Sequence, residues 1–152
     1  MKFEIKHLPE TKLYGEFVEM SLTNNRTHEL WKGFIQKLKS ENLNPSEKYS
    51  VAIYPEDYYQ NFSPNTVFEK GACIKDIKPH NDSKEIILEG KYAVFTYKGK
   101  ASNATPFFQK IFAETIPQNN LVIDDRPHFE LLTSKYLGEH PDSEEEVWIP
   151  VK

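Results

Sequence analysis

The sequence predicts an α+β fold built from two β-α-β-β modules. Three observations favour this fold class. Apolar and polar residues alternate in several short segments, which is typical of strands. Two longer segments instead repeat large apolar residues at helical spacing. The same order of elements then occurs twice along the chain, and the pattern Tyr14-x-x-Phe17 returns as Tyr92-x-x-Phe95.

Alternation predicts the first strands. Phe3 and Ile5 alternate with charged neighbours, and a second alternating run covers residues 13–22. The phase of this run slips between Phe17 and Val18, which predicts a bulge at that point.

The first helix is predicted over residues 26–40, because its large apolar residues recur at helical spacing while its lysines lie outside that stripe. It ends before Asn44-Pro45, a pair that disfavours helix continuation. A strand, a loop and a second strand are predicted next, at residues 49–54, 56–65 and 67–77. Gly71 predicts an interruption of the second of these strands.

A turn-rich cluster at residues 78–83 divides the chain, and the element order repeats beyond it. The second helix is predicted to start at Asn103 or Thr105 and to end at Pro117. Three strands are predicted around it, at residues 92–97, 128–133 and 147–151, and Gly90 and Gly99 predict breaks on either side of the first of them. We therefore expect a single domain over residues 1–152, with modules of about 1–79 and 85–152.

Composition indicates a folded chain. The 152 residues carry a net charge of −4 and are 13% aromatic, whereas disordered chains are poor in aromatic residues. The mild negative charge and the two arginines argue against nucleic-acid binding. The single cysteine, Cys73, excludes an intrachain disulfide and a multi-cysteine zinc site. With no apolar leader and no apolar run near the roughly 20 residues of a membrane span, we expect a cytoplasmic protein that does not bind membranes.

Alternation also sorts the residues of the last two strands into faces. We expect one set to pack under the helices, namely Phe129, Leu131, Val147 and Ile149. The other set would then face either solvent or a concave pocket, namely Glu130, Glu146 and Trp148. The five histidines show no metal-ligand spacing, so neither a metal site nor a cofactor is expected.

Six segments in order resemble the gyrase-inhibitor-like (GyrI-like) effector-binding family, which supplies ligand-binding domains of AraC-type and MerR-type regulators. The segments are Tyr49-Ser-Val-Ala-Ile-Tyr54, Phe68-Glu-Lys-Gly-Ala72, Gly90-Lys-Tyr-Ala-Val-Phe95, Phe108-Gln-Lys-Ile-Phe-Ala-Glu-Thr-Ile-Pro117, Pro127-His-Phe-Glu130 and Glu146-Val-Trp-Ile-Pro150. The resemblance covers essentially the whole chain. It implies a curved antiparallel sheet formed by two pseudo-symmetric modules, with two helices and a central groove.

The resemblance also implies a binding site, since drug-sensing members of the family hold flat, lipophilic cations with an acidic residue and surrounding aromatics. By position, Glu130 matches the acidic residue, and Glu146 and Trp148 match the acidic and aromatic positions of the closing strand. The remaining aromatic positions of the pocket are matched by Tyr54, Phe68 and Phe112. The family often has Trp where Phe108 stands and Tyr where Trp148 stands, which leaves the size of the ligand open.

Three functions follow from the resemblance. We favour a stand-alone multidrug-type binding protein that senses or sequesters a lipophilic, cationic small molecule. The second function is an enzyme that hydrolyses electrophilic genotoxins, with Glu130 as its catalytic acid or base. The third is a protein that acts through a partner, either a regulator or DNA gyrase.

Overall fold

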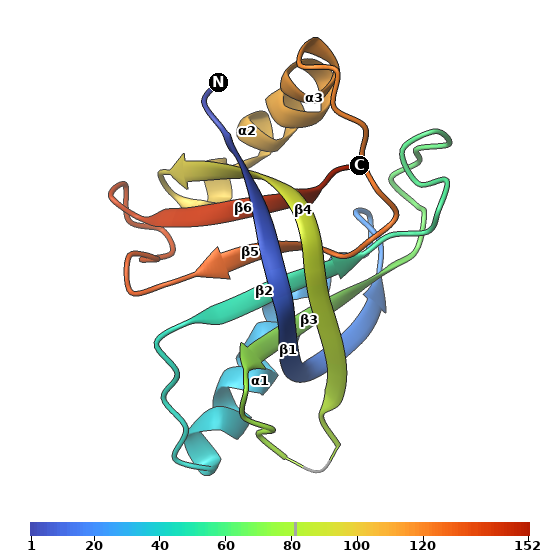
Figure 1. The fold of residues 1–152 in the computed structure, drawn as a ribbon. Helices are drawn as coiled ribbons and strands as arrows, with labels where there is room; N and C mark the ends of the chain where they lie inside the picture. Colours follow the sequence, from blue (N-terminus) through green and yellow to red (C-terminus); the bar gives the residue numbers. More distant parts are fainter. Residues whose placement is uncertain (81) are drawn as a thin grey trace.

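The computed structural model describes residues 1–80 and 82–152, in which six strands form a closed antiparallel barrel with the strand order β1-β3-β2-β5-β6-β4. The strands are β1 (Glu4–Met20), β2 (Lys48–Ile53), β3 (Phe68–Lys75), β4 (Lys84–Lys98), β5 (His128–Leu132) and β6 (Glu144–Pro150). Helix α1 (Thr27–Ser40) and a second helical segment lie outside the barrel at opposite ends of the molecule (Figure 1). The repeated β-α-β-β order and the α+β class are confirmed, and the curved sheet closes on itself.

The second helical segment changes its winding along its length. It consists of α2 (Thr105–Lys110), a π-helical turn η2 (Ile111–Thr115) and α3 (Ile116–Gln118), and the short 3-10 turn η1 (Ala101–Asn103) precedes it. The predicted start at Thr105 is confirmed, with Pro106 near the N-terminus, where a missing N–H costs no hydrogen bond. The π-helical turn was not predicted. None of the helices in the described residues is long and apolar enough to cross a membrane.

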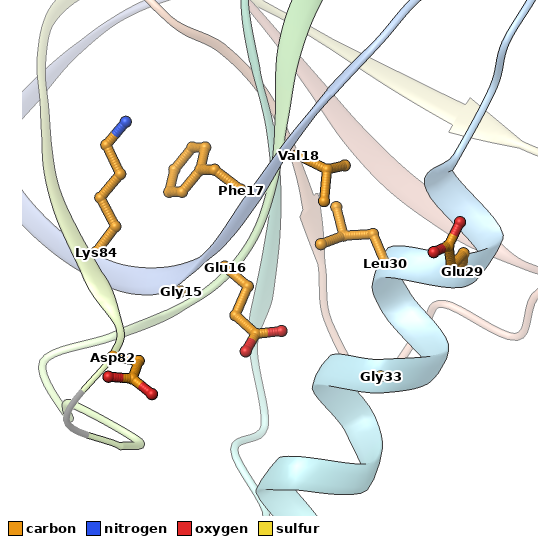
Figure 2. A pocket seen from close by; sticks show the side chains of 9 residues that line it. All are labelled: Gly15, Glu16, Phe17, Val18, Glu29, Leu30, Gly33, Asp82 and Lys84. Atoms are coloured by element: carbon orange, nitrogen blue, oxygen red, sulfur yellow. The ribbon is translucent and has the colours of Figure 1, made fainter.

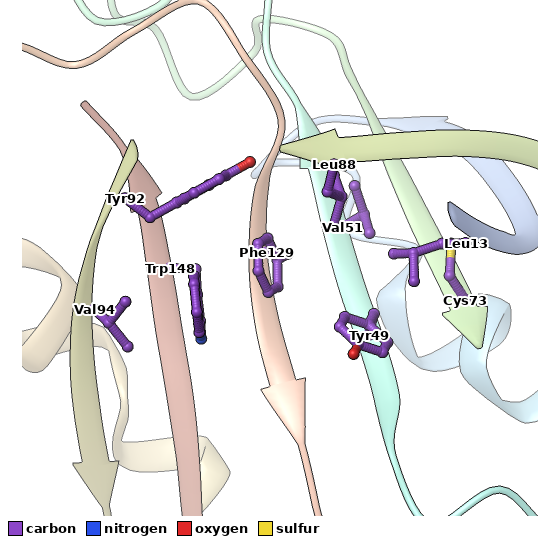
Figure 3. Close-up of a cluster of buried hydrophobic side chains, with 9 residues drawn as sticks. All are labelled: Leu13, Tyr49, Val51, Cys73, Leu88, Tyr92, Val94, Phe129 and Trp148. Atoms are coloured by element: carbon purple, nitrogen blue, oxygen red, sulfur yellow. The ribbon is translucent and has the colours of Figure 1, made fainter. Parts of the chain in front are cut away.

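The inside of the barrel is filled by large apolar side chains, many of them aromatic (Figure 3). Phe129 and Trp148 stack at its centre, with ring centroids 5.0 Å apart and planes 20° apart. Cys73 lies in the same cluster, where burial raises the pKa of its thiol to about 12. The members of this barrel cluster are Leu13, Tyr49, Val51, Cys73, Leu88, Tyr92, Val94, Phe129 and Trp148.

Each helical segment covers a different part of the outer face. Leu30, Phe34 and Leu38 of α1 pack on Ala72 and Ile74 of β3. The second helical segment packs on the other end of the barrel, in a cluster made of Ala93, Phe95, Ile111, Ile116, Val147, Ile149 and Val151. The barrel wall is therefore buried on both faces, and the stretch of outer face between the two helical segments is free to form a site.

The face assignment of the last two strands is wrong in part. Phe129 pairs with Trp148 across β5 and β6, whereas Glu130 pairs with Val147. Directly paired residues share a face, so Phe129 lies inside the barrel with Trp148, and Glu130 lies outside it. The error arises because alternation gives the period of a strand but not the register between two strands.

The predicted bulge between Phe17 and Val18 is also wrong. The pairing of β1 with β3 is continuous there, and the register shift of β1 lies instead between Leu8 and Thr11, around Pro9. Phe17 packs against the barrel cluster while Val18 packs against the cluster under α1. Phe17 and Val18 are both apolar because both faces of this strand are covered.

Two glycines that predicted breaks lie inside continuous strands. Gly71 lies within β3, where the ring of Phe17 occupies the space of its missing side chain. Gly90 has a positive φ of 106° within β4, and the guanidinium of Arg126 fills the space beside it. Arg126 donates hydrogen bonds to the carbonyl oxygens of Glu89, Lys91 and Val151. β4 therefore starts earlier than the predicted residues 92–97.

Gly15 and Gly33 provide a matched test of this packing. A Cβ on Gly15 would lie 1.9 Å from the carbonyl oxygen of Ala72, where β1 pairs with both β3 and β4. Nothing lies within 4 Å of a Cβ on Gly33, in the middle of α1. We expect Gly15→Ala to lower the free energy of unfolding by about 3 kcal/mol and Gly33→Ala to raise it by about 0.5–1 kcal/mol. Urea unfolding measures both, and equal effects would contradict the packing.

Candidate functional site

A small pocket lies on the outer face of the barrel, beside the second helical segment. Its polar and charged lining residues are Ser50, Lys70, His128 and Glu130, and the cavity measures about 40 Å³. Phe108 of α2 and Phe112 of η2 cover it from the helical side. The remaining lining residues are Ala52, Tyr54, Phe129, Val147, Trp148 and Ile149.

Aromatic rings from the segment after β2 close one side of this pocket. The ring of Tyr54 lies 4.8 Å from the ring of Phe68 and 4.9 Å from that of His128, measured between centroids. The ring of Tyr59 stacks on Phe112 at 5.0 Å and on His128 at 5.8 Å. We call these five residues the aromatic wall. Such a wall offers π-faces and apolar area but little charge.

The charged part of the site is a pair of carboxyl groups. Glu130 on β5 pairs directly with Val147, so Glu145 on β6 is its diagonal neighbour on the same face. Glu145 is only 7% exposed. Burial, then the charge of Glu130 and a hydrogen bond with it, raise the pKa of the Glu145 carboxyl to about 8. The Glu145 side of this pair therefore holds a proton more tightly than an isolated glutamate does.

The groups around this pair are cationic or neutral. Lys70 lines the pocket and its charge acts against the rise in the pKa of Glu145. Burial, followed by the charges of Lys70 and Arg126, lowers the pKa of His128 to about 3, so its ring is neutral at physiological pH. Burial also raises the pKa of the Tyr54 and Tyr59 hydroxyls. Ionisation of Glu145 would therefore add a negative charge beside the pocket.

The structure brings together five of the six predicted site residues. Glu130, Tyr54 and Phe112 line the pocket, Phe68 contacts the ring of Tyr54, and Trp148 borders the cavity although its ring lies in the barrel cluster. The expectation that Glu146 and Trp148 share a face with Glu130 is wrong. Glu146 lies opposite Leu131, and the Trp148 ring lies in the barrel cluster, so both side chains are on the inner face.

Sequence reasoning missed several residues of this site. Glu145 stands in a run of three glutamates, a composition that does not predict burial, yet it is buried beside Glu130. Tyr59 lies in the predicted loop, and its ring contacts with Phe112 and His128 link that loop to the pocket. Two signals were available in the sequence: Glu145 is in phase with Val147 and Ile149 on the last strand, and the short polar loop at residues 56–65 contains three aromatic residues.

A larger hollow of about 420 Å³ lies elsewhere, between β1, the first half of α1 and the start of β4 (Figure 2). Three of its four charged lining residues, Glu16, Glu29 and Lys84, already have partners of opposite charge. Glu16 contacts Lys37 and His80, and Lys84 contacts Glu69. Glu29 pairs with Arg26. The smaller pocket is the better candidate because Glu130 lines it beside the buried Glu145, and within residues 1–80 and 82–152 neither carboxyl group forms a salt bridge with a lysine or arginine.

The described residues contain no group of three or more His, Cys, Asp or Glu side chains placed to hold a metal ion. The site is therefore characterised by its aromatic wall and its carboxyl pair.

The family model of the GyrI-like small-molecule binding domain matches residues 1–152. The chain belongs to the GyrI-like family. No protein with a curated description matches it. A GyrI-like domain binds small molecules.

Solved structures with the same fold include three that match this chain over almost its whole length. The integron cassette protein VCH_CASS2 of Vibrio cholerae has a TM-score of 0.75 at 16% identity, over 99% of this chain and 95% of that one. SAV2435, solved with tetraphenylphosphonium bound, has a TM-score of 0.69 at 19% identity, over 100% and 94%. The C-terminal domain of EcmrR has a TM-score of 0.67 at 13% identity, over 99% and 97%. At these identities the similarity shows the shared fold.

The raised pKa of Glu145 gives the stability of the protein a pH dependence. Between its ordinary pKa of about 4.5 and its folded pKa of about 8, the folded protein holds a proton that the unfolded chain lacks. The free energy of unfolding contributed by this group therefore falls as the pH rises through that range. Glu145→Gln cannot ionise, so its stability relative to wild type should increase from pH 5 to pH 9.

Glu144→Gln is the matched control, since Glu144 precedes Glu145 on β6 and alternates to the opposite face. Urea unfolding at both pH values measures the two differences. A constant difference between Glu145→Gln and wild type would show that Glu145 is ionised throughout.

Proposed function

We propose that this GyrI-like domain binds a lipophilic organic cation in the pocket between the aromatic wall and the carboxyl pair, and thereby senses or sequesters it. The observation that carries the proposal is that Glu130, which lines a pocket of aromatic rings, has the buried Glu145 beside it. The tetraphenylphosphonium complex of SAV2435, which has the same fold, supports a ligand of this class.

The physical chemistry of the pocket favours a cation over an anion or a neutral molecule. Carboxylates taken out of water lose solvation, and a bound cation restores a partner for them. Each aromatic face adds a cation–π attraction of about 0.5–2 kcal/mol. Neither interaction is strongly directional, so the site should accept cations of several shapes.

Removal of the counter-charge tests the proposal. Glu130→Gln keeps the shape of the side chain and removes its charge, so it should weaken the binding of tetraphenylphosphonium by about ten- to a hundredfold. Tetraphenylmethane-like neutral analogues made soluble with a polar group should bind wild type and variant almost equally. Calorimetric titration of both ligands against both proteins provides the four affinities.

Glu146→Gln is the control, because Glu146 lies on the inner face of the same barrel wall. It should leave the affinity for the cation within about twofold of wild type, as expected for a residue outside the site. Two results would contradict the role of Glu130. One is an equal loss of affinity for the cation in Glu130→Gln and Glu146→Gln. The other is a loss of affinity for the neutral analogue in Glu130→Gln as large as the loss for the cation.

Cation binding should also release a proton. A cation favours the doubly ionised pair, whereas the empty pair retains a proton because the pKa of Glu145 is raised to about 8. The affinity should therefore rise as the pH increases from 6 to 9. Calorimetry at pH 7 in buffers of different ionisation enthalpy measures the number of protons released on binding. Glu145→Gln should show no such release.

A second function is supported by the same carboxyl pair. A protonated Glu145 beside an ionised Glu130 provides an acid and a base, the combination used for hydrolysis of electrophiles. A structure of the same fold at 10% identity is described as a hydrolase from Listeria innocua. Incubation with an epoxide substrate distinguishes the two functions, because an enzyme consumes it with multiple turnovers and a binding protein retains it unchanged.

A further inference from the structure

The pocket as it stands is too small for an organic cation. Its cavity measures about 40 Å³, which is close to the volume of a single water molecule. Pockets that bind drug-sized ligands measure roughly 300–1,000 Å³. If the proposed function holds, some side chain of the protein must leave the pocket when the ligand enters.

Tyr59 is the side chain best placed to leave. Its ring stacks on Phe112 and on His128, with an angle of 27° between the planes in both pairs. Phe112 and His128 both line the cavity and are held by a helix and a strand. Tyr59 instead comes from the segment between β2 and β3, outside the helices and strands of the described residues.

The neighbours of Tyr59 in that segment differ from it. Tyr58 is buried in a cluster with Met20, Ala52 and Phe68, and it anchors the segment to the barrel. Phe62 is 56% exposed and touches the ring of Tyr58. Ring contacts hold Tyr59 in place, since it packs against this cluster and its ring centroid lies 5.6 Å from that of Tyr54.

We propose that the Tyr59 ring occupies the position of the ligand's own aromatic ring, and that a planar aromatic cation displaces it and stacks on Phe112 and His128. This inference rests on the proposed function and adds the shape of the ligand to it. The stacking surface that Tyr59 covers fits one flat ring, with the carboxyl pair supplying the counter-charge. Tyr59 then competes with the ligand and lowers its affinity, although it looks like part of the binding wall.

The experiment is to remove the ring and measure affinity for a planar aromatic cation, with ethidium as the probe. Tyr59→Ala should bind ethidium about tenfold more tightly than wild type, because the stacking of Tyr59 no longer has to be broken. Association should also be faster, because no side chain has to move first. Phe62→Ala removes a ring from the same segment outside the pocket and should change neither quantity.

Phe112→Ala serves as the opposite variant, since it removes a surface on which the ligand itself stacks, and it should weaken binding. If Tyr59→Ala bound ethidium as weakly as Phe112→Ala, Tyr59 would be part of the wall on which the ligand stacks. That result would overturn this inference and leave the proposed function intact. Failure of wild type and of every variant to bind ethidium or tetraphenylphosphonium would instead overturn the proposed function.

A second measurement covers the case in which Tyr59→Ala does not fold. Nuclear Overhauser contacts between the Tyr59 and Phe112 rings should be present in the free wild-type protein and lost when ethidium is bound. Persistence of these contacts in the complex would overturn the inference.

Discussion

The register between β5 and β6 is the constraint on which both the core and the site depend. With Phe129 opposite Trp148 and Glu130 opposite Val147, the aromatic stack falls inside the barrel and the acidic residue falls outside. A slip of one residue would exchange the two faces of a strand. It would bring Glu130 into the barrel cluster and expose Phe129. The stacking of Phe129 on Trp148 therefore stabilises the barrel and, through the pairing, also orients Glu130 toward the pocket.

Two groups of the protein occupy the places that a cationic ligand would take: an aromatic ring and a proton. Tyr59 covers the stacking surface of Phe112 and His128, and the proton on Glu145 offsets what would otherwise be a second negative charge. Burying two ionised carboxylates without a partner would cost several kcal/mol. A shared proton avoids this cost in the absence of ligand, and the pocket keeps its capacity to become negative.

Element order was predictable because it depends on local spacing. The stripe of Leu30, Phe34 and Leu38 gives α1, and strand alternation gives most of the barrel. Breaks in β3 and β4 were predicted at Gly71 and Gly90, yet both strands continue, since Phe17 and Arg126 fill the spaces that these glycines leave. A glycine in a strand has no local signal that separates a break from a close approach.

The site was less predictable than the fold, since it depends on contacts between distant segments. Both faces of the barrel wall are covered by apolar groups, so Val147 and Trp148 look equally suited to either face in the sequence. Glu145 gains its unusual properties only from burial beside Glu130. Tyr59 enters the site through a loop whose path alternation cannot describe. Glu130, Tyr54 and Phe112 were identified through family resemblance, which carries the register that alternation lacks.

The position of Cys73 has a practical consequence. Its thiol lies inside the barrel, fully buried, and burial holds the pKa of the thiol at about 12, so very little reactive thiolate exists at neutral pH. As the sequence contains no second cysteine, a cysteine introduced on the surface would be the single fast-reacting thiol. A fluorophore attached at the exposed Phe62 position would then report on the segment beside the pocket, with the native cysteine left in place.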